Sequence, residues 1–264
     1  LEDMYPKVEA KKGNILLKVE GLTKHGEFYD ISFELYEGEV LGIAGLVGSG
    51  RTEVAQTLFG IRKKDRGRIY IREKEVEISS PKDAITHGIV YVPEDRHQHG
   101  LLLPMDIVCN VTLPILQSLA NKGVINKQEE ETLTKRYYEL LDIRATGFRQ
   151  KVMNLSGGNQ QKVVLAKWLA TNPRILILDE PTSALSVRET HKVLDLILNA
   201  KDQGLSVIFI THNIYHVYSV ADRFTILERG KKIGDFKKDE VTVDEIIELI
   251  RLGRKERSNG NGNR

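Results

Sequence analysis

Apolar residues come in short runs at the start of the chain and then in helical spacing, and this alternation predicts strands and helices in turn. Three apolar runs within residues 15–44, separated by glycines, predict strands. The last run, residues 40–44, is apolar throughout, which is typical of a strand buried on both faces of a parallel sheet. Residues 52–59 then place apolar side chains on one helical face.

The same alternation resumes in the second half of the chain. Runs at 89–92, 174–180 and 205–212 predict buried strands, and residues 186–201 predict a helix. Two shorter runs, G-R-I-Y-I-R and K-E-V-E-I, flank a charged turn and predict a further strand pair. The whole pattern predicts an α/β fold with a mostly parallel core sheet and an antiparallel β subdomain.

Between these halves the strand pattern is lost. The apolar residues of one amphipathic helix with an acidic first turn recur at i, i+4, i+7 and i+8: Leu133, Tyr137, Leu140 and Leu141. We therefore expect an inserted α-helical subdomain at about residues 104–165, within a domain that spans 15–252. Residues 1–14 are charged and aperiodic, which predicts a linker cut from a longer polypeptide. Residues 253–264 are polar and rich in glycine and asparagine, which predicts a disordered tail.

Composition narrows the classes of partner. With 264 residues, 41% apolar and 29% charged, the chain is typical of a globular protein with a sizeable core. Its 39 basic and 37 acidic residues leave a net charge of +2, so we expect no nucleic-acid partner. A run of 18 apolar residues is absent, and so is a signal peptide, so the sequence predicts no membrane span. The single cysteine, Cys109, is expected to pack as a small hydrophobe.

A glycine-rich stretch carries the first candidate chemistry. It has the spacing of a phosphate-binding loop, with arginine in place of the usual lysine: Gly45, Leu46, Val47, Gly48, Ser49, Gly50, Arg51 and Thr52. Because it follows a buried strand and opens a helix, its backbone N–H groups and the helix N-terminus can face a polyphosphate. Thr52 would then place its hydroxyl on Mg²⁺. The simpler alternative is a flexible turn between strand and helix.

Two acids, Asp179 and Glu180, end the apolar run at 174–180. The carboxyl ends of parallel strands gather at one edge of a sheet, so we expect both acids beside the glycine loop. Asp179 would hold Mg²⁺ through water, and Glu180 would orient or deprotonate an attacking water. An apolar strand that only happens to end in charges is the alternative.

A second glycine pair also precedes a helix. The stretch contains Leu155, Ser156, Gly157, Gly158, Asn159 and Gln160. It offers another helix N-terminus that can face an anion, or it is a capped helix with no ligand.

Taken in order, these motifs resemble those of ABC-type ATPases, which have the P-loop NTPase fold. The resemblance covers residues 15–250 and includes L-S-G-G followed by I-L-I-L-D-E-P-T, and His212 after S-V-I-F-I-T. More narrowly, G-I-A-G-L-V-G-S-G-R-T-E, V-Y-V-P-E-D-R and L-S-G-G-N-Q-Q-K-V are similar to the second nucleotide-binding half of tandem ATPases in ribose- and galactose-type sugar importers.

That resemblance implies ATP and Mg²⁺ as cofactors. It implies catalytic roles for Glu180, His212 and Glu94, with Glu94 near the metal of Thr52 and Asp179, and it places Glu53 beside the nucleotide. The adenine-stacking aromatic is open among His25, Phe28 and Tyr29.

The family also implies partners for the chain. Such ATPases work in pairs, so the L-S-G-G of this chain would complete the ATP site of another nucleotide-binding half. Transmembrane permease subunits would meet the helical insert and the Glu94 loop, and a sugar-binding protein would act indirectly. The implied location is the cytoplasmic face of the membrane, as a peripheral protein.

Departures from the family pattern leave two hypotheses open. Arg51 replaces lysine, Glu94 replaces a usual glutamine, and Ser186 stands where an acid is usual. The chain is then either an active ATPase half of a monosaccharide importer, as the retained His212 favours, or a degenerate regulatory half that completes its partner's site. A non-transport ABC protein acting on ribosomes or DNA is disfavoured, because basic residues do not cluster outside the short tail.

Overall fold

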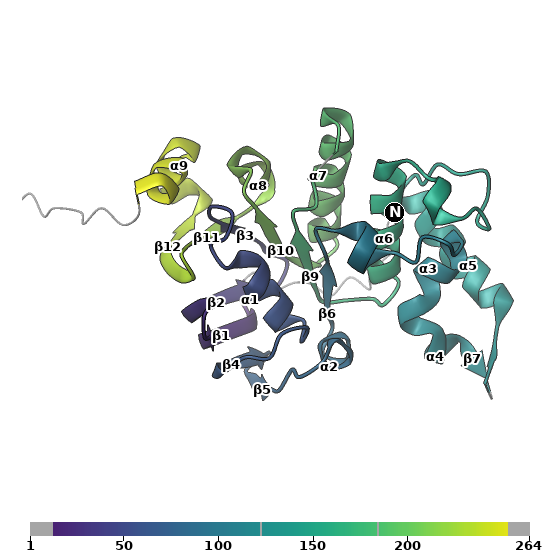
Figure 1. Cartoon of the computed structure of the whole chain (residues 1–264), viewed down its shortest axis with the longest axis horizontal. Coiled ribbons are helices and arrows are strands. Elements are labelled where there is room, and N and C mark those ends of the chain that lie inside the picture. Colours follow the sequence, from purple (N-terminus) through teal and green to yellow (C-terminus); the bar gives the residue numbers. More distant parts are fainter. Residues whose placement is uncertain (1–12, 122, 184, 253–264) are drawn as a thin grey trace, which may run out of the picture.

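The computed structural model describes residues 13–121, 123–183 and 185–252 (Figure 1). Most of the expected linker and the whole expected tail lie outside these described residues. Among the helices that are described, none is both long and apolar enough to cross a membrane.

The core is a six-stranded sheet in the order β12-β11-β3-β10-β9-β6. Its strands are β3 (Val40–Ala44), β6 (Ile89–Val92), β9 (Ile175–Asp179), β10 (Ser206–Thr211), β11 (Arg223–Glu228) and β12 (Lys231–Lys237). Five of them pair in parallel and only β12 runs antiparallel to its neighbour, which confirms the predicted mostly parallel sheet.

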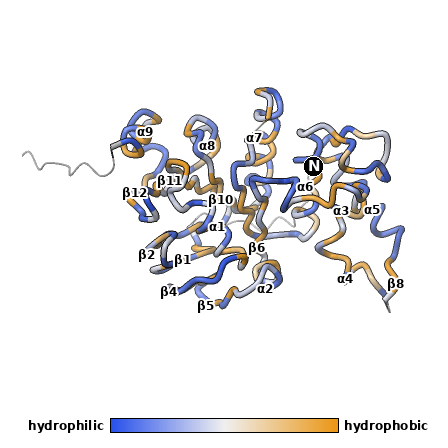
Figure 2. Tube along the Cα trace, in the orientation of Figure 1, coloured by the Kyte–Doolittle hydropathy of each residue, from blue (hydrophilic) through white to orange (hydrophobic). Residues whose placement is uncertain are grey.

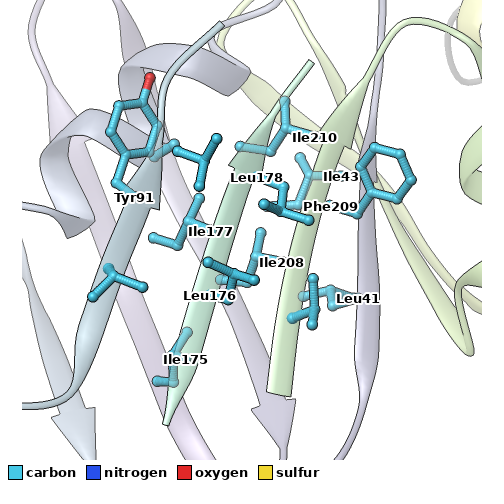
Figure 3. Close-up of a cluster of buried hydrophobic side chains, with 14 of the residues drawn as sticks. Leu41, Ile43, Tyr91, Ile175, Leu176, Ile177, Leu178, Ile208, Phe209 and Ile210 are labelled. Carbon is cyan, nitrogen blue, oxygen red and sulfur yellow. The ribbon is translucent and has the colours of Figure 1, made fainter. Parts of the chain in front are cut away.

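Every residue of β3, β6, β9 and β10 is buried. Figure 3 shows the buried side chains of these strands, with Ile210 of β10 beside its register partner Ile43 of β3. Figure 2 shows the same concentration of hydrophobic residues in the central strands. Burial on both faces explains why these strands read as continuous apolar runs in the sequence.

Helices cover the core sheet. They are α1 (Arg51–Leu58), α2 (Pro81–Thr86), α7 (Val187–Asp202), α8 (Ile214–Val220), α9 (Val243–Leu252) and the short 3-10 turn η4 (Lys238–Glu240). In the view of Figure 1, α7, α8 and α9 lie side by side above the core strands, while α1 lies below with the second sheet. The predicted helix over 186–201 is α7, whose N-cap Ser186 exchanges hydrogen bonds with Glu189 in a capping box.

A four-stranded antiparallel sheet, β2-β1-β4-β5, forms the second layer. Its strands are β1 (Ile15–Lys24), β2 (Phe28–Tyr36), β4 (Arg66–Ile71) and β5 (Lys74–Val76). All three neighbouring pairs are antiparallel, which confirms the expected antiparallel β subdomain.

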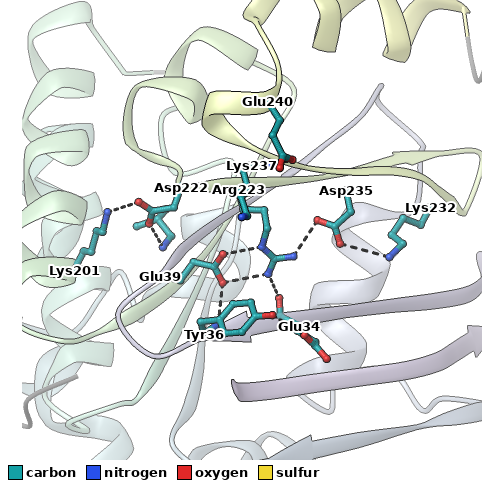
Figure 4. Close-up of polar contacts among 11 residues, drawn as sticks. Glu34, Tyr36, Glu39, Lys201, Asp222, Arg223, Lys232, Asp235, Lys237 and Glu240 are labelled. Carbon is teal, nitrogen blue, oxygen red and sulfur yellow. Dashed lines mark hydrogen bonds and ion pairs between the residues drawn. The ribbon is translucent and has the colours of Figure 1, made fainter. Parts of the chain in front are cut away.

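An ionic network ties the two sheets together (Figure 4). Arg223 of β11 donates to Glu39 at 2.8 Å, to Asp235 at 3.0 Å and to the backbone oxygen of Glu34 on β2. Next to it, Asp222 accepts from the amide of Val40 at 2.9 Å. Only 14% of the Arg223 side chain is exposed, so the network replaces water around a largely buried charge.

The helical insert follows β6. It contains the π-helix η1 (Arg96–Gly100), α3 (Ile107–Thr112), η2 (Leu113–Ile115), α4 (Leu116–Leu119), α5 (Lys127–Leu140), η3 (Val152–Asn154) and α6 (Gly157–Leu169). The amphipathic helix predicted from the apolar spacing is α5, and the Tyr137 hydroxyl donates to the carbonyl of Leu169 at 2.8 Å. A small hairpin, β7 (Ala120–Asn121) and β8 (Val124–Ile125), was not predicted. Cys109 is partly buried, and burial raises the pKa of its thiol to about 11, so the thiol stays protonated at neutral pH.

Candidate nucleotide-binding site

The glycine loop joins β3 to α1 at the carboxyl edge of the core sheet. Gly48 and Gly50 have φ values of +79° and +93°, a backbone conformation that glycine adopts without strain. A Cβ on Gly45 would lie 2.3 Å from the carbonyl oxygen of Leu227. Leu46 and Val47 are 56% and 83% exposed, so they form the outer wall of the loop. The sequence therefore builds a cradle whose inner surface is backbone.

Arg51 points inward from the first turn of α1. The residue is only 6% exposed, and its Nη2 lies 3.4 Å from Oε1 of Glu180. Its Nη1 is buried without a hydrogen-bond partner, as is the hydroxyl of Ser49 in the same loop. Burial lowers the pKa of Arg51, and the charge of Glu180 opposes that shift. Buried polar atoms without partners are uncommon, and here they mark where a polar ligand would complete the site.

The two residues that the sequence predicts to hold Mg²⁺, Thr52 and Asp179, are in contact. The Thr52 hydroxyl donates to Oδ1 of Asp179 at 3.1 Å, and the hydroxyl of Tyr91 donates to Oδ2 at 2.8 Å. Burial raises the pKa of Asp179 to about 6, and the charge of Glu180 adds to this shift, although the hydrogen bonds from Tyr91 and Thr52 favour the charged form. Sequence reasoning missed Tyr91, which lies inside the apolar run of β6.

Around Glu180 hydrogen bonds converge from the end of β10. Its carboxylate accepts from the Thr211 hydroxyl at 2.8 Å and from the His212 amide at 2.8 Å, and it lies 2.9 Å from Nδ1 of His212. An ionised Glu180 requires the proton of a neutral His212 to sit on Nδ1, which leaves Nε2 free to accept a hydrogen bond. Glu180 has a φ of +48°, and the contacts just named hold it in this sparsely populated region. The His212 side chain is 56% exposed.

The remaining predicted residues of this site lie at its edge. Glu94 is exposed just beyond β6, and its charge is one of those that raise the pKa of Asp179. Glu53 is partly exposed in the first turn of α1.

Among the three aromatic candidates, Phe28 is wrong. Its side chain is fully buried in the core, because β2 begins there with its first residue facing inward. His25 and Tyr29 are exposed and have ring centroids 6.2 Å apart. Gly230 bonds to the backbone of both Tyr29 and Ser49, which holds this pair near the glycine loop.

The second glycine pair lies on the helical insert, at the start of α6. Ser156 is exposed at the N-cap without a side-chain bond to the helix backbone, and its Oγ accepts from Asn159 at 2.9 Å. Leu155 and Gln160 are buried beneath it. Within the described residues, no hydrogen bond or ion pair joins this stretch to the glycine loop. The glycine loop and this stretch are therefore described as two separate surfaces of the chain.

Comparison with known proteins accounts for this combination. A family model described as ABC transporter matches residues 28–183. The chain belongs to the ABC transporter family. In the resemblance described above, the stretch from Leu155 to Gln160 corresponds to the signature of this family, and it is called the signature below; the glycine loop corresponds to the family's phosphate-binding loop.

Curated relatives are named as sugar-import proteins. The chain is 42% identical to a ribose import ATP-binding protein, RbsA 3, of Rhizobium etli over 247 residues, which are 94% of this chain and 48% of that protein. It is 39% identical to the galactose/methyl galactoside import ATP-binding protein MglA 1 of Photobacterium profundum over 252 residues, 94% of this chain and 50% of that protein. The chain thus spans about half the length of the curated relatives it matches.

Solved structures share the fold. An ATP-binding cassette, MJ1267, in its ADP conformation aligns with a TM-score of 0.73 at 22% identity, over 90% of this chain and 96% of that one. A dimeric post-hydrolysis cassette, MJ0796, bound to ADP and Pi aligns with a TM-score of 0.71 at 23% identity, over 84% of this chain and 99% of that one. These likenesses confirm the predicted P-loop NTPase fold.

Proposed function

We propose that this chain is one nucleotide-binding half of an ABC importer that couples ATP binding and hydrolysis to monosaccharide uptake. The observation that carries the proposal is the convergence of Thr52 with Asp179, and of Arg51 and His212 with Glu180, at the N-terminus of α1. Three separate segments of the chain supply these groups, which is the arrangement that ATP hydrolysis requires. The identity to ribose and galactose import proteins supports the substrate class.

The residues fit a magnesium nucleotide. Backbone N–H groups from Leu46 to Gly50 and the N-terminus of α1 would hold the phosphates, and Arg51 would add a fixed charge. Mg²⁺ would be held by Thr52 and Asp179, and when bound it would neutralise charge on the phosphate oxygens.

Hydrolysis would depend on Glu180 and His212. The Glu180 carboxylate, fixed by Thr211 and His212, would orient the attacking water and accept its proton. His212 would use its free Nε2 to contact that water or the terminal phosphate. Glu94, at the edge of the site, would approach the metal when nucleotide is bound.

Partners complete the proposal. The signature of this chain would close over ATP held by a second nucleotide-binding half, so that ATP favours the paired state and hydrolysis releases it. Permease subunits would contact the helical insert near Leu102, Met105 and Met153, whose side chains are each at least 44% exposed. The chain would then act at the cytoplasmic face of the membrane as a peripheral protein, with a sugar-binding protein as an indirect partner.

A second candidate function rests on Arg51. Its guanidinium is paired with Glu180. The cation expected to bind phosphate therefore also engages the carboxylate expected to activate water. A half with this arrangement could bind ATP without cleaving it and serve mainly to complete the partner's site. Arginine is larger and more planar than the lysine ammonium, which favours binding over catalytic geometry.

Single-turnover hydrolysis by the assembled transporter tests the two against each other. We expect Glu180→Gln in this chain to leave one of two bound ATP molecules uncleaved, while the exposed control Glu75→Gln cleaves both. Equal cleavage by wild type and Glu180→Gln would assign the regulatory role. Failure of the wild type to bind ATP at all would contradict both functions.

A further inference from the structure

The segment that follows Glu94 packs along α6, the helix that begins at the signature. The ring of His97 lies 2.7 Å from Oε1 of Gln160, and the ammonium of Lys167 donates to the carbonyl of Gly100 at 3.0 Å. A Cβ on Gly100 would come 3.2 Å from Val164, so η1 and α6 are in close contact. Gln160, Val164 and Lys167 lie on one face of α6, and η1 runs along it.

Arg96, the first residue of η1, reaches the signature itself. A Cβ on Gly157 would lie 2.9 Å from Nη2 of Arg96, so the guanidinium rests against the first signature glycine. Its Nε is buried without a hydrogen-bond partner. In residues 13–121, 123–183 and 185–252, no hydrogen bond or close ion pair engages Arg96. A cation with unused donors thus stands beside the signature.

The carboxylate of Glu189 lies against the other signature glycine, Gly158. A Cβ on Gly158 would lie 2.0 Å from Oε1 of Glu189. The other oxygen of Glu189 accepts from the amide of Ser186 at 3.1 Å and from its hydroxyl at 2.9 Å. Hydrogen bonds from Ser186, together with the charge of Arg96, lower the pKa of Glu189, so the carboxylate is ionised at neutral pH.

We propose that Arg96 is a nucleotide-contacting residue of the signature surface, which donates to the terminal phosphate of the ATP bound by the partner half, and that Glu189 opposes this contact. The inference rests on the proposed function, because only pairing brings that ATP to the signature. An arginine with free donors makes strong charge-assisted bonds to phosphate. The γ-phosphate, which is the terminal phosphate of ATP, is absent from ADP. Arg96 would therefore favour the paired state before hydrolysis and no longer favour it afterwards.

Equilibrium binding of radiolabelled Mg·ATP and Mg·ADP to the assembled transporter tests the assignment. Arg96→Gln should weaken ATP at one of the two sites by roughly tenfold and leave ADP unchanged, as expected for one charge-assisted bond. Arg96→Lys keeps the charge and should retain most of the affinity. Glu189→Gln keeps the helix cap and should tighten ATP about twofold, again without effect on ADP.

Arg66→Gln is the matched control. It removes the same charge from an exposed position on β4, and it should change neither nucleotide. Equal weakening of ATP and ADP binding by Arg96→Gln, or no weakening of either, would overturn the inference. It would also be overturned if Arg96→Gln and Glu189→Gln changed the affinity for ATP in the same direction. A wild-type transporter that binds ATP no more tightly than ADP at either site would overturn the proposed function itself.

Discussion

The two surfaces that we propose to face ATP, the one around Glu180 and the signature, differ in how their polar groups are engaged. The Glu180 carboxylate is engaged within the chain: it has contacts with Thr211, His212 and Arg51, and the residue is 7% exposed. At the signature, Ser156 is exposed and Arg96 has no bonded partner among the described residues. A site that orients a water must be rigid before the substrate arrives, whereas a surface that closes on a partner's substrate must keep its donors free. Under the proposed function, the site around Glu180 performs chemistry within this chain, and the signature contacts a nucleotide held by another half.

The largest expected effect separates the two surfaces most sharply. Asp179→Asn removes the charge beside Thr52, and we expect hydrolysis at this chain's own site to fall by about 10³-fold, since metal-dependent phosphoryl transfer loses its cation site. Single-turnover cleavage in the assembled transporter measures it. ATP bound against the signature should be cleaved as before, and a loss at both sites would break the distinction.

Adding a methyl group to the signature tests the other surface. Gly158→Ala places a Cβ against the carboxylate of Glu189, so one side chain must shift. We expect cleavage of the partner's ATP to fall by about a hundredfold, as for the loss of one well-placed donor group. Binding of ATP to this chain's own loop should not change. Gly147→Ala, where a Cβ would meet nothing within 4 Å, is the control.

Arg223 has no proposed role at either surface, so its substitution should affect activity at the two sites equally. Arg223→Ala leaves Glu39 largely buried without its partner, and we expect the free energy of unfolding to fall by about 3 kcal/mol. Chemical denaturation measures the change. Any residual activity should decline equally at the two sites, and a selective loss at one of them would place Arg223 in that site.

The smallest effect is a pH dependence confined to the first surface. The pKa of Asp179 is raised to about 6 in the folded protein, so the folded state holds a proton that the unfolded state has lost. The free energy of unfolding of the nucleotide-free protein should therefore decrease as pH rises from about 4 to 6, by up to roughly 1.4 kcal/mol per pH unit. Asp179→Asn should abolish this component of the slope. An unchanged slope in that variant would assign the pH dependence to other groups.

Sequence patterns predicted the strands that are buried on both faces, because nothing but apolar residues fits there. They also predicted the meeting of Thr52 with Asp179, since parallel strands end at one edge. Tyr91 was missed because a tyrosine within an apolar run gives no sign of where its hydroxyl points. Phe28 was misassigned among the aromatic candidates, because an aromatic at a strand end fits either face. The pairing of Arg96 and Glu189 with the signature glycines joins residues distant in sequence, which no local pattern encodes.

The ionic network of Arg223 also bears on the order in which the protein can assemble. Arg223 and Glu39 are 184 positions apart, and β3 pairs with β10 and β11, which are made long after it. During synthesis β3 leaves the ribosome early, yet its sheet neighbours β10 and β11 are made near the end of the domain. Contacts of such high sequence separation form slowly, because a long loop must close first. We therefore expect β3 to depend on chaperone protection until translation has passed β11.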